Sequence, residues 1–69
     1  MIQELDVVAL THDRPEEGLT TGDVGTIVHC HRAKEAFEVE FVDERGHTKC
    51  VTTVPAAQLM KLNLPSRSP

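Results

Sequence analysis

The sequence predicts an all-β protein in which five short strands close into a small barrel. The strongest signal is the segment Phe37-Glu38-Val39-Glu40-Phe41, which alternates apolar and acidic residues with the period of two that marks a half-buried strand. Other short runs, rich in Val, Ile and Thr, are separated by turn-forming residues. The segment 56–59 is compatible with only a single helical turn, so helices contribute little to the predicted fold.

The expected strands lie at residues 5–10, 23–30, 37–41, 47–54 and 60–62. The first connection, residues 11–22, is long and contains Pro15, Gly18 and Gly22, which favour fixed or left-handed backbone conformations. Residues 43–46 form a tight turn, with Gly46 at the position that tolerates a left-handed conformation. Gly25 lies inside the second strand and predicts a bulge or a sharp bend there.

A long first loop, a tight turn between the third and fourth strands and one short helical turn before the last strand follow the order of the SH3-like barrels. We therefore expect an SH3-like barrel domain at residues 1–63 and a disordered tail at residues 64–69. The predicted core residues are Val8, Leu10, Leu19, Val24, Ile27, Val28, Phe37, Val39, Phe41, Cys50, Leu59 and Leu62.

The chain also resembles the domain-of-unknown-function family 4926, a group of small bacterial proteins. The resemblance rests on residues 5–10, Pro15, Gly18-Leu19, 22–28, 37–43, Gly46 and Gln58-Leu59. It implies an SH3-like barrel and brings no activity, substrate or site residue with it. Residues 22–28 additionally resemble the KOW motif of ribosomal and transcription-factor barrels, over a short stretch.

The charge balance disfavours nucleic acid as a partner. Eleven acidic and seven basic side chains give a net charge of −4, and Phe37 and Phe41 are the only aromatic residues of the Phe, Trp and Tyr class. Proteins that bind nucleic acid need Lys and Arg for the phosphates and often aromatic rings for the bases. No signal peptide is recognisable, and the longest apolar run, residues 7–10, is too short to cross a bilayer. We therefore expect a cytoplasmic protein without membrane contact.

Histidines and cysteines occur as His29-Cys30-His31 and as His47 with Cys50, which are good zinc ligands by type. In a meander the second and fourth strands flank the third, so the two groups lie two strand spacings of about 4.8 Å apart. That separation excludes a joint zinc site, and it also excludes a disulfide between Cys30 and Cys50. No cofactor is expected; whether His29 and His31 bind a metal stays open.

Catalysis is not expected, because a barrel of this size is filled by its own side chains and offers no cleft for an acid–base pair. We expect a non-catalytic module that binds an unknown protein through the long first loop and an acidic sheet face, as an antitoxin-like or accessory protein, with self-association left open. The candidate partner-binding residues are Asp13, Arg14, Glu16, Glu17, Glu38, Glu40 and Asp43. The alternative is a KOW-like nucleic-acid-binding barrel that uses Arg14, Arg32, Lys34 and Arg45, if these converge on one face.

The alternation of residues 37–41 makes the register of the central hairpin testable. With residues 43–46 as the turn, Val39 faces Cys50 and Glu40 faces Lys49. A slip of one residue would bury both carboxylates and expose both phenylalanines. We expect Phe41→Ala to destabilise the protein by ~3–5 kcal/mol, whereas Glu40→Ala changes stability little. Urea denaturation of the two variants measures both values, and equal losses would show that the inward face is assigned wrongly.

Overall fold

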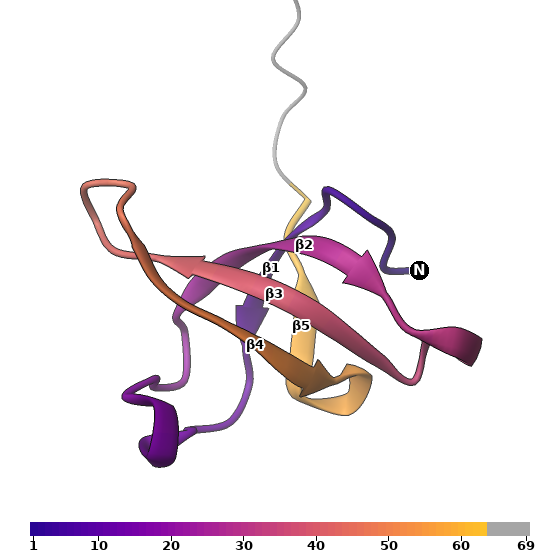
Figure 1. Cartoon of the computed structure of the whole chain (residues 1–69), viewed down its shortest axis with the longest axis horizontal. Coiled ribbons are helices and arrows are strands. Elements are labelled where there is room, and N and C mark those ends of the chain that lie inside the picture. Colours follow the sequence, from indigo (N-terminus) through magenta and orange to yellow (C-terminus); the bar gives the residue numbers. More distant parts are fainter. Residues whose placement is uncertain (64–69) are drawn as a thin grey trace, which may run out of the picture.

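A computed structural model describes residues 1–63 and shows an all-β chain, as the sequence predicts (Figure 1). The strands are β1 (Val7–Leu10), β2 (Val24–Cys30), β3 (Ala36–Val42), β4 (Thr48–Pro55) and β5 (Leu59–Lys61). The predicted helical turn before the last strand is the 3-10 turn η3 (Ala56–Gln58), and two further 3-10 turns are present, η1 (Pro15–Glu17) and η2 (Arg32–Lys34). The predicted tail, residues 64–69, lies outside the described residues.

The five strands form one antiparallel sheet in the order β4-β3-β2-β1-β5. As expected, β2 and β4 flank β3. In addition, β5 returns to pair with β1. In Figure 1, β1 and β5 run across the direction of β2, β3 and β4, so the sheet is strongly bent rather than flat. This arrangement is compatible with a small barrel-like fold.

The core lies between the two parts of the bent sheet. On β3, Phe37, Val39 and Phe41 are buried and alternate with half-buried residues. The rest of the core comes from the other strands and the first loop: Val8, Leu10, Leu19, Ile27, Val54 and Leu59. Cys50 and Leu62, also predicted there, are only partly buried.

Two core predictions on β2 are wrong. The side chains of Val24 and Val28 lie at the surface, with 38% and 40% of their area exposed. Gly25 and Ile27 are buried, so simple alternation already places Val24 and Val28 on the opposite face of β2. The pairing of β2 with β3 shifts only beyond Ile27, between Ile27 and His29. The bulge therefore lies at Val28 and not at Gly25, where the sequence suggested one.

The predicted register of the β3–β4 hairpin is also wrong, although its inward and outward faces are right. Phe41 pairs with Cys50 and Glu40 with Val51, whereas Val42 pairs with Thr48, which leaves Lys49 as an extra residue. The bulge and a longer turn displace the register by two residues, and a shift of two keeps the face of every side chain. Lys49 accordingly does not face Glu40; its Nζ lies 3.1 Å from Oδ2 of Asp23.

Gly25 is needed because β3 passes very close to it. A Cβ at this position would lie 2.7 Å from Cγ1 of Val39 and 2.8 Å from the main-chain oxygen of Glu40. Gly25 pairs with Phe41, and a Cβ would also come within 3.0 Å of the Phe41 ring. The missing side chain lets the two strands and the core residues of β3 close over this point.

We expect Gly25→Ala to destabilise the protein by about 1–3 kcal/mol or more, because a contact with the backbone is not relieved by a rotamer change. Thr26→Ala, the next residue on the opposite face, serves as the control and should cost much less. Chemical denaturation of both variants gives the comparison. Equal stability of Gly25→Ala and the wild type would show that the strands are further apart than described here.

Candidate interaction surfaces

The first loop is held against the sheet by Arg14. Its guanidinium forms a two-pronged ion pair with Glu17 and donates to Oε1 of Gln58 at 2.9 Å and to the main-chain oxygen of Thr53 at 3.1 Å. Glu17 in turn accepts a hydrogen bond from the hydroxyl of Thr52. We call this group of contacts between the loop, β4 and η3 the Arg14–Glu17 clamp.

Local sequence explains why the loop can reach β4. Pro15 begins the η1 turn, and Gly18 ends it in a left-handed conformation with φ of 71°. The chain then returns so that Leu19 pairs with Arg14 and is buried in the core, with 1% of its area exposed. Asp13 stabilises the end of the loop, because its Oδ1 accepts bonds from both the main-chain N–H and the hydroxyl of Thr21.

The clamp has an electrostatic signature. The hydrogen bond from Arg14, followed by that from Thr52, holds the pKa of Glu17 below its ordinary value. The hydrogen bond to Glu17 likewise raises the pKa of Arg14. Only 19% of the Arg14 side chain and 24% of the Glu17 side chain are exposed. Both residues were predicted to bind a partner, and the structure instead engages them within the chain; Glu16 is exposed.

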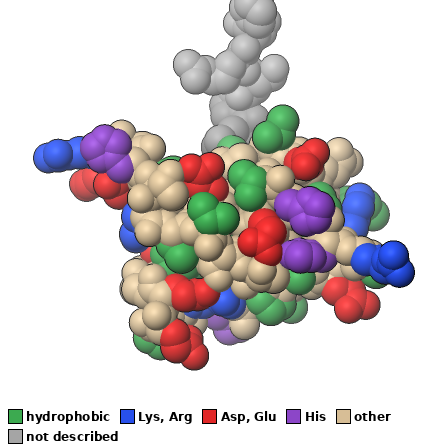
Figure 2. Space-filling model, in the orientation of Figure 1, with side chains coloured by type: hydrophobic (Ala, Val, Ile, Leu, Met, Phe, Trp, Pro, Cys, Tyr) green, Lys and Arg blue, Asp and Glu red, His purple; other side chains and the backbone are tan. Residues whose placement is uncertain are grey.

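The second predicted surface lies on the side of β2, β3 and β4 that faces away from the core, here called the outer face. Glu40 lies in a cross-strand row with Thr26 and Val51, and Glu38 lies in the next row with Thr53. The exposed valines of this part of the sheet are Val24, Val28 and Val51, with 38%, 40% and 56% of their area accessible. Figure 2 shows acidic and apolar side chains interleaved on the face turned to the viewer, with histidines beside them.

The two glutamates of the outer face are bonded to hydroxyl groups and a histidine rather than to lysine or arginine. Glu38 accepts hydrogen bonds from the hydroxyl of Thr53 and from Nε2 of His31 at 2.9 Å. These bonds, the Thr53 hydroxyl first, lower the pKa of Glu38. Glu40 accepts a bond from the hydroxyl of Thr48. Within residues 1–63, neither glutamate forms an ion pair with a lysine or arginine, in contrast to Glu17.

Asp43, the last predicted partner-binding residue, shapes the turn between β3 and β4. Its Oδ1 accepts the main-chain N–H groups of Arg45 and His47, each at 2.9 Å. Gly46 follows with φ of 84°, the left-handed conformation that the sequence predicts for it. Asp43 thus lies at the end of the hairpin rather than beside Glu38, and its carboxylate is used to close the turn.

The histidine and cysteine positions show no metal cluster. The rings of His29 and His31 meet edge to face, with centroids 5.3 Å apart. Among the described residues, no group of three or more His, Cys, Asp or Glu side chains is arranged to hold a metal ion. Cys30 and Cys50 are free and partly buried, and both pack against the core.

The four basic residues of the nucleic-acid alternative are dispersed. Arg32 and Lys34 lie in η2, which precedes β3, whereas Arg45 lies in the turn that follows β3. Figure 2 shows lysine or arginine side chains at opposite ends of the molecule. Arg14 is engaged in the clamp. The four residues therefore do not converge on one face.

Comparison with protein families gives one match. The model of a domain of unknown function, DUF4926, matches residues 4–61, which is most of the chain. The chain belongs to the DUF4926 family. No curated protein and no solved structure matches it.

For this DUF4926 protein, a search of residues 1–63 finds no helix long and apolar enough to cross a membrane. The family match agrees with the resemblance noted in the sequence. It adds no site residue, so the surfaces described above rest on their own geometry.

The clamp makes stability depend on pH in a defined direction. Folding lowers the pKa of Glu17, so the ionised carboxylate stabilises the folded state. This stabilisation is fully present above the unfolded pKa of about 4.3, and it is lost as the pH falls through the lower folded pKa. We expect Glu17→Gln to be less stable than the wild type at pH 7. As the pH is lowered from 5 into the strongly acidic range, the variant should lose less stability than the wild type. Denaturation midpoints at several pH values test this, with Glu16→Gln as the control. A parallel loss in wild type and Glu17→Gln would contradict the role of the clamp.

Proposed function

We propose that this DUF4926 protein is a non-catalytic protein-binding module that uses the outer face of β2, β3 and β4 to bind a basic segment of another protein. We further propose that its fold is an SH3-like barrel. The strand order, the long first loop and the 3-10 turn η3 before β5 support that assignment. The two cysteine thiols are free, as suits the reducing cytoplasm.

The observation that carries the proposal is that the outer face combines carboxylates without a lysine or arginine partner with exposed valines. Glu38 and Glu40 project from the middle strand of the outer face without a lysine or arginine partner among the described residues. Exposed Val51 pairs with Glu40 on β4, and exposed Val24 and Val28 lie on β2, the strand on the other side of β3. A cationic partner would gain charge complementarity from the glutamates, and its apolar groups would cover the valines.

The first loop supports binding indirectly. Arg14 and Glu17 hold the loop against β4, and Asp13 bonds Thr21 within the loop, so we assign these three residues to the scaffold rather than to the contact surface. A rigid scaffold lowers the entropy that a surface loses when a partner binds. The proposed contact residues are thus fewer than the sequence suggested, and they lie on a sheet rather than on a loop.

The dispersed arginines and lysines favour a protein over a nucleic acid as the partner. A nucleic-acid surface requires several cations on one face to neutralise successive phosphates. Here Arg32 and Lys34 lie before β3, Arg45 lies after it and Arg14 lies in the clamp, while β3 carries Glu38 and Glu40 between them. Lys49 and Lys61 are paired with Asp23 and Asp6.

The test is affinity purification from host lysate with cross-linking mass spectrometry, with wild-type protein and a Glu38→Gln/Glu40→Gln variant as baits. We expect the wild type to retain a partner cross-linked next to the outer face, and the variant to bind it at least about tenfold more weakly, the effect of losing about 1.4 kcal/mol. Glu4→Gln/Glu44→Gln changes the net charge equally and should bind like the wild type. Equal recovery with all three baits, or recovery that nuclease abolishes, would reject the proposal.

A further inference from the structure

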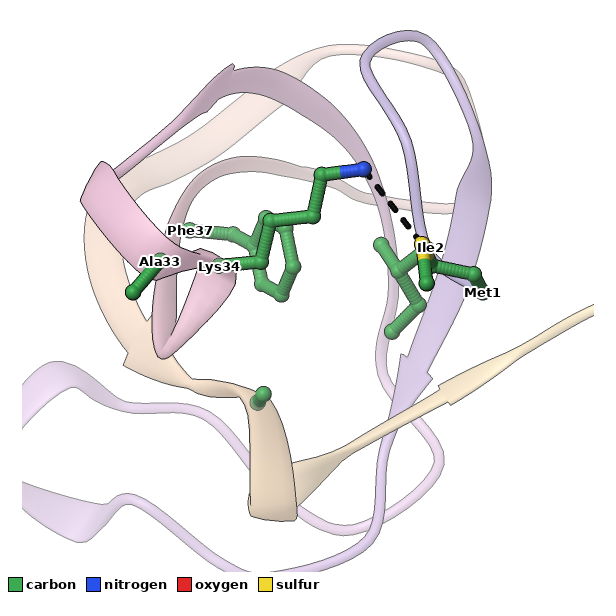
Figure 3. A pocket seen from close by; sticks show the side chains of 6 residues that line it. Met1, Ile2, Ala33, Lys34 and Phe37 are labelled. Atoms are coloured by element: carbon green, nitrogen blue, oxygen red, sulfur yellow. Dashed lines mark hydrogen bonds between the residues drawn. The ribbon is translucent and has the colours of Figure 1, made fainter.

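A pocket of about 330 Å³ opens at one end of the core, away from the outer face (Figure 3). It is formed where the N-terminal segment, the η2 turn, the start of β3 and the start of η3 meet. The lining residues are Met1, Ile2, Ala33, Lys34, Phe37 and Ala56. Because Phe37 points to the core side of β3, this pocket and the outer face lie on opposite sides of that strand.

The side chains that line the pocket are apolar apart from that of Lys34. Phe37 is almost fully buried, with 2% of its area exposed, while Ile2 and Ala56 pack against the core cluster from its edge. A ligand in this space would therefore cover apolar surface that is continuous with the core. The volume lies at the lower end of the range for small-molecule sites, which is about 300–1,000 Å³.

The charged side chain of the lining is Lys34. Figure 3 shows its side chain extended across the pocket, with Nζ directed toward Met1. Nζ donates to Sδ of Met1 at 3.4 Å, and a thioether is a weak acceptor for an ammonium group. Within residues 1–63 Lys34 has no ion pair with a carboxylate, and neither does the neighbouring Glu35 with a cation.

The backbone around Lys34 is strained. Ala33 and Lys34 adopt positive φ values of 64° and 56°, although neither is a glycine. Such conformations are unfavourable for residues with a side chain and are concentrated at ligand sites and turns. The Lys34 side chain is exposed to solvent, but this turn places it along the pocket, so that one ligand could meet both its ammonium group and the apolar lining.

We propose that the pocket binds a small free monocarboxylate with an apolar chain, the size of octanoate. The chain would fill the space against Phe37, Ile2 and Ala56, and the carboxylate would replace the Met1 sulfur as the partner of Lys34. This ligand matches both properties of the site, an apolar interior and one unpaired cation. The inference does not depend on the partner proposed for the outer face.

The test is a titration of ¹⁵N-labelled protein with sodium octanoate, followed by amide chemical shifts. We expect saturable shifts at Lys34, Phe37 and Ala56. The neutral analogue 1-octanol should bind about tenfold or more weakly, because it lacks the charge-assisted hydrogen bond. The absence of saturation with octanoate, or shifts confined to other parts of the chain, would overturn the proposal.

Variants separate the role of Lys34 from general charge. Lys34→Gln should weaken octanoate binding about tenfold and leave 1-octanol binding unchanged. Arg32→Gln removes an equal charge from the same turn without lining the pocket and should bind octanoate like the wild type. Equal effects of the two substitutions would show a non-specific charge effect and reject the site. Tighter binding of N-acetyl-glycyl-leucine than of octanoate would also reject a free monocarboxylate, in favour of a peptide C-terminus.

Discussion

The structure depends above all on the burial of one face of β3. This strand is paired on both sides, and Phe37, Val39 and Phe41 supply the centre of the core. Burying their apolar surface is the largest favourable contribution available to so small a domain. It also determines which side of the sheet carries Glu38 and Glu40, because neighbouring residues of a strand point to opposite faces. The core and the acidic outer face are two results of the same alternation.

Neighbouring elements are adapted to this strand. Gly25 leaves room for the side chains of Val39 and Phe41, and Leu19 enters the core from the first loop. Two charged residues of the loop, Arg14 and Glu17, pair with each other and hold the loop against the edge of the sheet. The outer-face glutamates, by contrast, receive only hydroxyl groups and a histidine. The charged residues of the clamp are thus paired with each other, whereas the glutamates of the outer face have no lysine or arginine partner among the described residues.

The sequence was sufficient for the features that depend on periodicity. The alternation of residues 37–41 predicts both faces of β3, and Gly46 and the short turn at 56–58 lie where their residue types place them. Features that depend on one extra residue in a strand were not predictable. One bulge in β2 lies between Ile27 and His29, and a bulge at Lys49 in β4 sends the Lys49 ammonium group to Asp23 instead of Glu40. No composition rule marks these two positions.

The role of a charged residue in the candidate surfaces was equally difficult to predict from the sequence. An exposed glutamate and a clamped glutamate look alike in a sequence, because the difference lies in contacts such as Arg14 with Gln58, 44 positions apart. The pocket beside Lys34 could not be predicted from the sequence for a similar reason. Met1, Ala33 and Ala56 carry no chemical signature, and only the fold brings them to one place.

The position of the clamp has a consequence for the behaviour of the protein in solution. β4 has β3 as its sole neighbour in the described sheet, and an unpaired strand edge invites pairing with another copy. Arg14 occupies the main-chain oxygen of Thr53 on this strand, and Glu17 occupies the hydroxyl of Thr52. The loop thus covers part of the free edge of β4 and hinders the pairing of this strand with another copy of the chain. Because the clamp lowers the pKa of Glu17, the ion pair persists as the pH falls below the ordinary range of a glutamate, and the edge of β4 stays covered there too.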